Sequence, residues 1–170
     1  MGNNIKIAHI GAGYWGKNII RNLVELNCLK IVCDNNQETL NAYQRQYPKL
    51  AYKNDVDDVL ADKSIDAVTI ATPANTHFSL VRKALQADLD VFVEKPLALK
   101  PEEGEELAEL AQEQDRILMI GHILRYHPAI EKAKELIENG MLGRVGYCYS
   151  NRLNLGKVRK EENILWRIDS

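Results

Sequence analysis

The sequence has few of the residues that mark secreted, metal-binding or membrane-spanning proteins. Among its 170 residues are three cysteines, Cys28, Cys33 and Cys148, and their spacing matches no zinc or redox motif. No apolar run approaches the roughly 18 residues of a membrane-spanning helix, and the N-terminus lacks the pattern of a signal peptide. We therefore expect a cytoplasmic protein with reduced thiols, no metal site and no membrane partner.

An excess of charge of one sign is also missing. The chain carries 22 Lys and Arg against 24 Asp and Glu, which gives a formal net charge of −2. Proteins that bind nucleic acid usually present an excess of basic residues, so this balance argues against such a partner. What the chain does have is 45% hydrophobic residues, which is enough for one core and a remainder that belongs to a second unit.

Apolar residues follow two alternating periods along the chain. Short β-rich runs, typical of buried strands, are separated by stretches in which apolar residues recur at helical spacing. The predicted strands are 5–10, 29–33, 51–52, 67–71, 90–93 and 117–120. The predicted helices are about 14–26, 37–47, 55–60, 77–87, one that begins at residue 101, and 128–139. This alternation favours an α/β fold with a parallel sheet covered on both faces.

The segment between the first predicted strand and the first predicted helix is rich in glycine. It reads GAGYWG and matches G-x-G-x-x-G, a pattern that is weak alone but gains weight between a strand and a helix. There Gly11 permits a tight turn, Gly13 lets the backbone approach a pyrophosphate, and Gly16 lets the helix and strand pack closely. The N-terminus of the helix then offers free N–H groups to the phosphates.

An acidic residue ends the second predicted strand. Asp34 lies where dinucleotide-binding units place a carboxylate that accepts hydrogen bonds from the adenosine ribose. A carboxylate there repels a 2′-phosphate, and Asn35 follows it with no arginine nearby to receive one. We therefore predict NAD in preference to NADP. The alternative is an aspartate that merely begins a turn.

Tyr14 and Trp15, in the glycine loop, pack either over the phosphates or against apolar loop residues.

The pattern changes after Gly143. Val145, Tyr147 and Tyr149 alternate with small or polar residues over 144–153, which is typical of a strand with one solvated face. The predicted organisation is a Rossmann-type, doubly wound parallel sheet over residues 1–122. A connecting helix and the first strand of a truncated α/β substrate domain follow it over residues 123–170.

Further motifs follow the ends of successive predicted strands. After the glycine loop and Asp34 come ATPANTH at 71–77, EKP at 94–96, GH at 121–122 and RYHP at 125–128. This ordered set resembles the Gfo/Idh/MocA family of NAD(P)-dependent oxidoreductases over about residues 5–166. The tail at 150–166 resembles a narrower branch, the nucleotide-sugar dehydrogenases of surface-polysaccharide pathways such as the UDP-N-acetylglucosamine 3-dehydrogenases.

The resemblance implies roles for individual residues. It makes Lys95 the catalytic-site lysine, whose ammonium favours alkoxide character at the reacting hydroxyl as hydride leaves for the nicotinamide, and it favours a cis Lys95–Pro96 bond. With the glycine loop and Asp34, the expected cofactor-binding residues are Gly11, Gly13, Tyr14, Trp15, Gly16, Asp34, Asn35, Ala71, Thr72, Pro73, Asn75, His77, Glu94, Lys95 and His122. The expected substrate-facing residues are Lys95, His122, Arg125 and Tyr126.

Histidines in these motifs leave open choices. His77 is interpreted as a helix-start residue close to the cofactor. His122 either reaches the nicotinamide or substrate, or is a satisfied histidine under its loop. His9 lies inside the first strand and is expected to be structural.

The predicted function is NAD-dependent oxidation of a secondary hydroxyl on a sugar or nucleotide sugar, of the UDP-N-acetylhexosamine type, by a protein that forms a homo-oligomer at full length. The family's downstream histidine or aspartate pair has no counterpart, since no histidine follows His127 and Asp169 cannot be assigned that role. We therefore expect this chain to bind cofactor but to show little turnover. The alternatives are a non-catalytic NAD-binding module and a class I methyltransferase, which also pairs a glycine loop with an acidic strand end.

Overall fold

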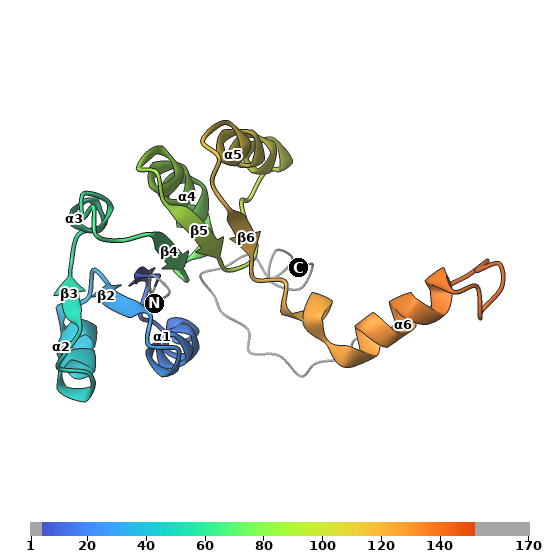
Figure 1. The fold of residues 1–170 in the computed structure, drawn as a ribbon, viewed down its shortest axis with the longest axis horizontal. Coiled ribbons are helices and arrows are strands. Elements are labelled where there is room, and N and C mark those ends of the chain that lie inside the picture. The colour runs from blue at the N-terminus through green and yellow to red at the C-terminus, as the bar shows by residue number, and fades with distance from the viewer. Residues whose placement is uncertain (1–4, 152–170) are drawn as a thin grey trace. The chain divides into compact units, whose positions relative to one another are not determined.

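A six-stranded, fully parallel sheet forms the centre of the fold. The computed structural model describes residues 5–151, and its strand order is β3-β2-β1-β4-β5-β6 (Figure 1). The strands are β1 (Ile7–Ile10), β2 (Leu29–Cys33), β3 (Ala51–Lys53), β4 (Ala67–Ile70), β5 (Asp90–Val93) and β6 (Leu118–Ile120). This is the doubly wound Rossmann order, so the predicted fold class is confirmed.

Helices connect the strands and begin at the positions that local sequence favours. They are α1 (Gly16–Glu25), α2 (Gln37–Gln46), α3 (Val56–Leu60), α4 (His77–Gln86), α5 (Pro101–Glu113) and α6 (Pro128–Glu138), with short 3₁₀ turns η1 (Ala74–Thr76) and η2 (Ile123–Tyr126). Asn36 and Asp55 cap α2 and α3 by accepting hydrogen bonds from backbone N–H groups. Pro101 and Pro128 occupy first helical positions, where a missing N–H has no cost. None of the helices within residues 5–151 is long and apolar enough to cross a membrane.

Apolar residues are buried on both faces of the sheet. Helices α3, α4 and α5 cover one face, and α1 and α2 lie on the other (Figure 1). The first cluster includes Ala8, Ile10, Ile31, Val59, Val68, Ile70, Val81, Leu85, Val91, Val93 and Leu107. The second includes Ile20, Leu23, Leu29, Val32 and Leu40. Each fully buried aliphatic side chain contributes about 1.5–3 kcal/mol to the free energy of folding. Packing on both faces therefore fixes the strands, and with them the loops that follow their ends.

Contacts within the chain divide it into two units, Met1–Gly121 and His122–Ser170. In the described part of the second unit, residues 122–151, the regular elements are η2 and α6. The strand predicted over 144–153 does not form in residues 144–151, so that prediction is wrong there. A strand needs a hydrogen-bonded neighbour, and no described segment pairs with this one. Residues 152–153, and the rest of the tail motif to residue 166, lie outside the described residues.

Candidate functional site

Strands β1 and β4 lie side by side at the centre of the sheet, where the strand order reverses. From β1 the chain crosses to β2 on one side, and from β4 it crosses to β5 on the other. The loops that follow β1 and β4 therefore lead to opposite sides at the carboxyl edge, and this is the place where open α/β sheets bind ligands. Because all six strands are parallel, the residues after β2 and β5 reach the same edge.

The three glycines of the loop after β1 meet three different requirements. Gly11 has a φ of 97°, and a Cβ there would lie 2.8 Å from the carbonyl of Ala71. A Cβ on Gly16 would collide with the carbonyl oxygen of Gly11. A Cβ on Gly13 would meet nothing within 4 Å. Gly11 and Gly16 are therefore required by the fold itself, whereas Gly13 leaves open space beside the N-terminus of α1 for a ligand.

Asp34 follows β2 and contacts the glycine loop. Its Oδ2 accepts a hydrogen bond of 2.7 Å from the backbone N–H of Ala12, and its Oδ1 accepts one of 2.8 Å from the backbone N–H of Asn36. A carboxylate offers about four acceptor positions, so two positions remain for ribose hydroxyls. These free acceptor positions fit a dinucleotide whose adenosine ribose lies at the end of β2. Asn35, beside it, is exposed.

Hydroxyl groups order the loop after β4. The Thr76 hydroxyl donates a 2.7 Å hydrogen bond to the Pro73 carbonyl, and its oxygen lies 2.7 Å from the Thr72 hydroxyl. Since the proton of Thr76 is used by Pro73, Thr72 donates to Thr76. Pro73 and Asn75 are exposed beside this pair. The loop predicted to contact the cofactor therefore has a fixed shape.

His77 links the loop after β4 to the loop after β5. Its side chain is buried, with Nδ1 2.6 Å from the Pro96 carbonyl oxygen and Nε2 2.9 Å from the Thr72 carbonyl oxygen. A ring held in this way directs both nitrogens at backbone rather than at a ligand. His77 therefore affects the predicted cofactor site indirectly, by holding the two loops together. One of these loops carries Lys95.

The segment after β5 also contacts the glycine loop. The Lys95–Pro96 peptide bond is cis, as the family resemblance implies. The Trp15 indole N–H donates a 2.6 Å hydrogen bond to Glu94, whose carboxylate lies 3.1 Å from the position that a Cβ on Gly121 would occupy. Glu94 thus joins the loop after β1 to the end of β6. Trp15 is held by a polar contact, which neither of the two sequence interpretations includes.

Tyr14 projects from the same loop and is 66% exposed. The Lys17 ammonium lies 4.8 Å from its ring centroid, a cation–π contact. Tyr14 is therefore not packed among apolar loop residues.

The predicted substrate-facing residues after β6 belong to the second unit. Arg125 and Tyr126 are exposed and line a shallow cavity of about 260 Å³ with Ile130, Glu131 and Lys134. His122 is also exposed and directly precedes η2. Within that unit, the structure brings Arg125 and Tyr126 together beside the first turns of α6.

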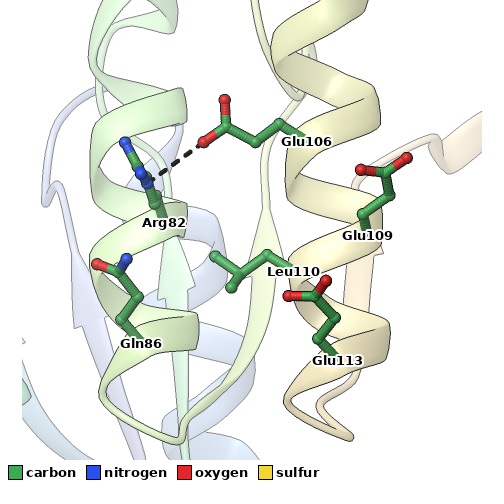
Figure 2. A pocket seen from close by; sticks show the side chains of 6 residues that line it. All are labelled: Arg82, Gln86, Glu106, Glu109, Leu110 and Glu113. Carbon is green, nitrogen blue, oxygen red and sulfur yellow. Dashed lines mark ion pairs between the residues drawn. The ribbon is translucent and has the colours of Figure 1, made fainter.

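A second hollow lies between α4 and α5 and has the wrong charge for a dinucleotide. Figure 2 shows Arg82 and Gln86 from α4 facing three glutamates of α5, Glu106, Glu109 and Glu113. Arg82 forms a 3.3 Å ion pair with Glu106 at one end. Helices between parallel strands run opposite to them, so the later turns of α4 and α5 approach the amino edge of the sheet. This groove is remote from the glycine loop.

His9 is structural, as expected from the sequence, but its contact with the glycine loop was not predicted. His9, in β1, is fully buried, with Nε2 3.0 Å from the Gly11 carbonyl oxygen and Nδ1 2.7 Å from the Thr69 hydroxyl. Burial lowers the pKa of His9 to about 4 and outweighs the opposing effects of the Gly11 carbonyl and the Asp34 carboxylate. The available signal was a polar side chain inside an apolar strand, two residues before the glycine turn.

Comparisons with known proteins agree with this geometry. The chain is 31% identical over 160 residues to a 2,7-anhydro-N-acetylneuraminate hydratase of Mediterraneibacter gnavus. The aligned region covers 94% of this chain and 42% of that protein. It is 36% identical over 126 residues to a UDP-N-acetylglucosamine 3-dehydrogenase of Acidithiobacillus ferrooxidans. Here the aligned region covers 74% of this chain and 39% of that protein. The chain thus spans less than half the length of either relative.

A solved structure has the same fold. The crystal structure of scyllo-inositol dehydrogenase from Lactobacillus casei, with bound NAD(H) and scyllo-inositol, matches with a TM-score of 0.76 at 26% identity. The match covers 83% of this chain and 43% of that one. The model of the Gfo/Idh/MocA oxidoreductase family, NAD-binding Rossmann fold, matches residues 5–122, and this match rules out the methyltransferase alternative. With its sheet order and its glycine loop, the chain therefore belongs to the Gfo/Idh/MocA family of oxidoreductases and carries that family's NAD-binding fold.

Proposed function

We propose that this chain supplies the NAD-binding part of a dehydrogenase that oxidises a secondary hydroxyl of a sugar or nucleotide sugar. The position of Lys95 carries the proposal. Lys95 follows β5 at the same edge of the sheet as the glycine loop, and its neighbour Pro96 is tied through His77 to the loop after β4. A relative named as a UDP-N-acetylglucosamine 3-dehydrogenase and a neighbour crystallised with scyllo-inositol support a substrate with a hydroxylated ring.

The residues at the carboxyl edge fit a bound dinucleotide. The glycine loop and the N-terminus of α1 would hold the pyrophosphate, and Asp34 would accept hydrogen bonds from the adenosine ribose. The expected contacts nearer the nicotinamide are Ala71, Thr72, Pro73, Asn75, Glu94 and His122. When bound, NAD accepts hydride at its nicotinamide ring. The choice of NAD over NADP rests on the Asp34 carboxylate and on the two asparagines that follow it.

Lys95 is assigned to the reacting hydroxyl. In its neutral form, Nζ would accept the hydroxyl proton, and the ammonium formed in this way would stabilise the negative charge that develops on the oxygen. Arg125 and Tyr126 are assigned to the substrate, because their cavity also presents Lys134 and Glu131, groups that suit a polar ring. We also propose a cytoplasmic location, in keeping with a nucleotide cofactor, and a homo-oligomeric full-length form.

A lysine substitution tests the proposal in a protein that joins this chain to a substrate-binding domain. Lys95→Met keeps the length of the side chain but removes its charge and proton acceptor. We expect NAD affinity to stay within about twofold, while kcat for NADH formation from UDP-N-acetylglucosamine or scyllo-inositol falls about a hundredfold or more. Lys100→Met is the matched control, since Lys100 lies in the same loop and is exposed; it should leave kcat unchanged.

Two results would contradict the proposal. Normal turnover by Lys95→Met would remove Lys95 from the chemistry. A wild-type protein that binds NAD but oxidises no hydroxylated ring compound would favour the non-catalytic module instead.

Because one relative is named a hydratase, the loss of substrate should be measured together with the formation of NADH. Substrate loss without NADH would point to a reaction with no net oxidation.

A further inference from the structure

His9 and Asp34 hold opposite ends of one peptide group in the glycine loop. The Gly11 carbonyl oxygen lies 3.0 Å from His9 Nε2, and the N–H of the same peptide, on Ala12, donates to Asp34 Oδ2 at 2.7 Å. A peptide group is planar, so fixing its oxygen and its N–H fixes its orientation. The next residue, Gly13, is the one whose surroundings are open. The contacts of His9 therefore set the direction in which the loop continues past the ligand space.

Chemistry determines which nitrogen of His9 carries the proton. With its pKa lowered to about 4 by burial, the ring is neutral near pH 7 and has a single N–H. The Gly11 carbonyl only accepts hydrogen bonds, so the proton is on Nε2 and donates to it. Nδ1 then carries a lone pair, and the Thr69 hydroxyl, 2.7 Å away, donates to it. Both partners of the ring are thereby satisfied inside the core.

The contact also crosses the point where the strand order reverses. His9 and Thr69 are register partners on β1 and β4, the two strands on either side of that point. A Cβ on Gly16 would lie 2.7 Å from His9 Nε2, so the ring also occupies the space beneath the first turn of α1. The ring thus touches β4, the glycine turn and the start of α1, three parts that a dinucleotide site must hold in register.

We infer that His9 is a positioning residue for the pyrophosphate-binding loop, acting through an Nε2–H donor that orients the Gly11–Ala12 peptide. His9 does not touch the cofactor. It keeps the following amides of the loop in the direction that a pyrophosphate needs. The inference rests on the NAD-binding fold and is independent of hydride transfer, so loss of the proposed dehydrogenase activity would leave it standing.

Two substitutions of His9 separate its two hydrogen bonds. The amide of Gln reaches the place of Nε2, whereas the amide of Asn reaches only the place of Nδ1. We expect His9→Gln to bind NAD within about twofold of the wild-type affinity, and His9→Asn to bind it about tenfold more weakly, the effect of one buried hydrogen bond. Adenosine, which lacks the pyrophosphate, should bind all three proteins equally. Both ligands are titrated into the 170-residue chain and followed by NMR.

The ring of the wild-type protein supplies a second measurement that needs no variant. Long-range ¹H–¹⁵N spectra near pH 7 should show His9 as the Nε2–H tautomer. An Nδ1–H tautomer or a doubly protonated ring would overturn the inference. So would NAD affinities of His9→Asn and His9→Gln that are equal to each other. A loss of NAD and adenosine affinity by the same factor would show that His9 acts on stability alone, and would also overturn it.

Discussion

His9 is a buried base in an otherwise apolar strand, and its charge state therefore contributes to stability. Burial lowers its pKa from 6.5 to about 4, so the unfolded chain takes up a proton at pH values where the folded protein excludes it. The stabilisation is complete above about pH 6.5 and is lost as the pH falls toward 4. A shift of this size corresponds to about 3 kcal/mol.

Urea unfolding between pH 7 and pH 4 checks this expectation. The free energy of unfolding of the wild type should fall by about 3 kcal/mol more than that of His9→Gln, which lacks the titrating ring. Groups other than His9 titrate in both proteins and cancel in the comparison. Parallel pH dependences would mean that His9 has an ordinary pKa in the folded state.

At the scale of single elements, different glycines of the loop are expected to affect stability and NAD binding. Gly13→Ala puts a methyl group into space that is open in the protein. The free energy of unfolding should therefore change by less than about 1 kcal/mol, while NAD affinity falls because the methyl group meets the pyrophosphate. Gly16→Ala should instead cost about 2 kcal/mol or more, because its Cβ collides with the Gly11 carbonyl.

Chemical unfolding and NAD titration of the two variants provide the comparison. If Gly13→Ala bound NAD as tightly as the wild type, the ligand would not approach the loop at that position. If Gly16→Ala were as stable as the wild type, the loop and α1 would have to separate more easily than the structure indicates.

Some elements were predictable from sequence because their signals are local. The strands at 29–33 and 90–93 have the predicted bounds, and Pro101 begins α5 as expected. The contacts of His9 with Thr69 and of His77 with Pro96 were not predictable, because they join residues 60 and 19 positions apart. Such contacts depend on strand order, which no local pattern encodes. The alternation of apolar and polar residues after Gly143 wrongly predicted a strand in residues 144–151. The reason is related, because a strand also needs a hydrogen-bonded partner strand.

On the scale of the whole molecule, all the proposed cofactor contacts except His122 belong to the first unit. All six strands and both apolar clusters lie within Met1–Gly121. A chain ending at Gly121 should therefore fold cooperatively, keep its free energy of unfolding within about 1 kcal/mol of the 170-residue chain, and bind NAD with similar affinity. Calorimetry of both chains is the check. Loss of cooperative unfolding in the shorter chain would show that the first unit depends on residues after Gly121.

The central claim is that NAD binds where β1 and β4 diverge, with Asp34 selecting it over NADP. Titration of the ¹⁵N-labelled chain with each dinucleotide, followed through its backbone amides, tests this most directly. NAD should shift the amides of residues 11–16, 34–36 and 71–77 and leave those of Arg82 and Glu113 in place, while NADP binds at least about tenfold more weakly. Shifts confined to the groove between α4 and α5, or equal affinity for the two dinucleotides, would contradict the claim.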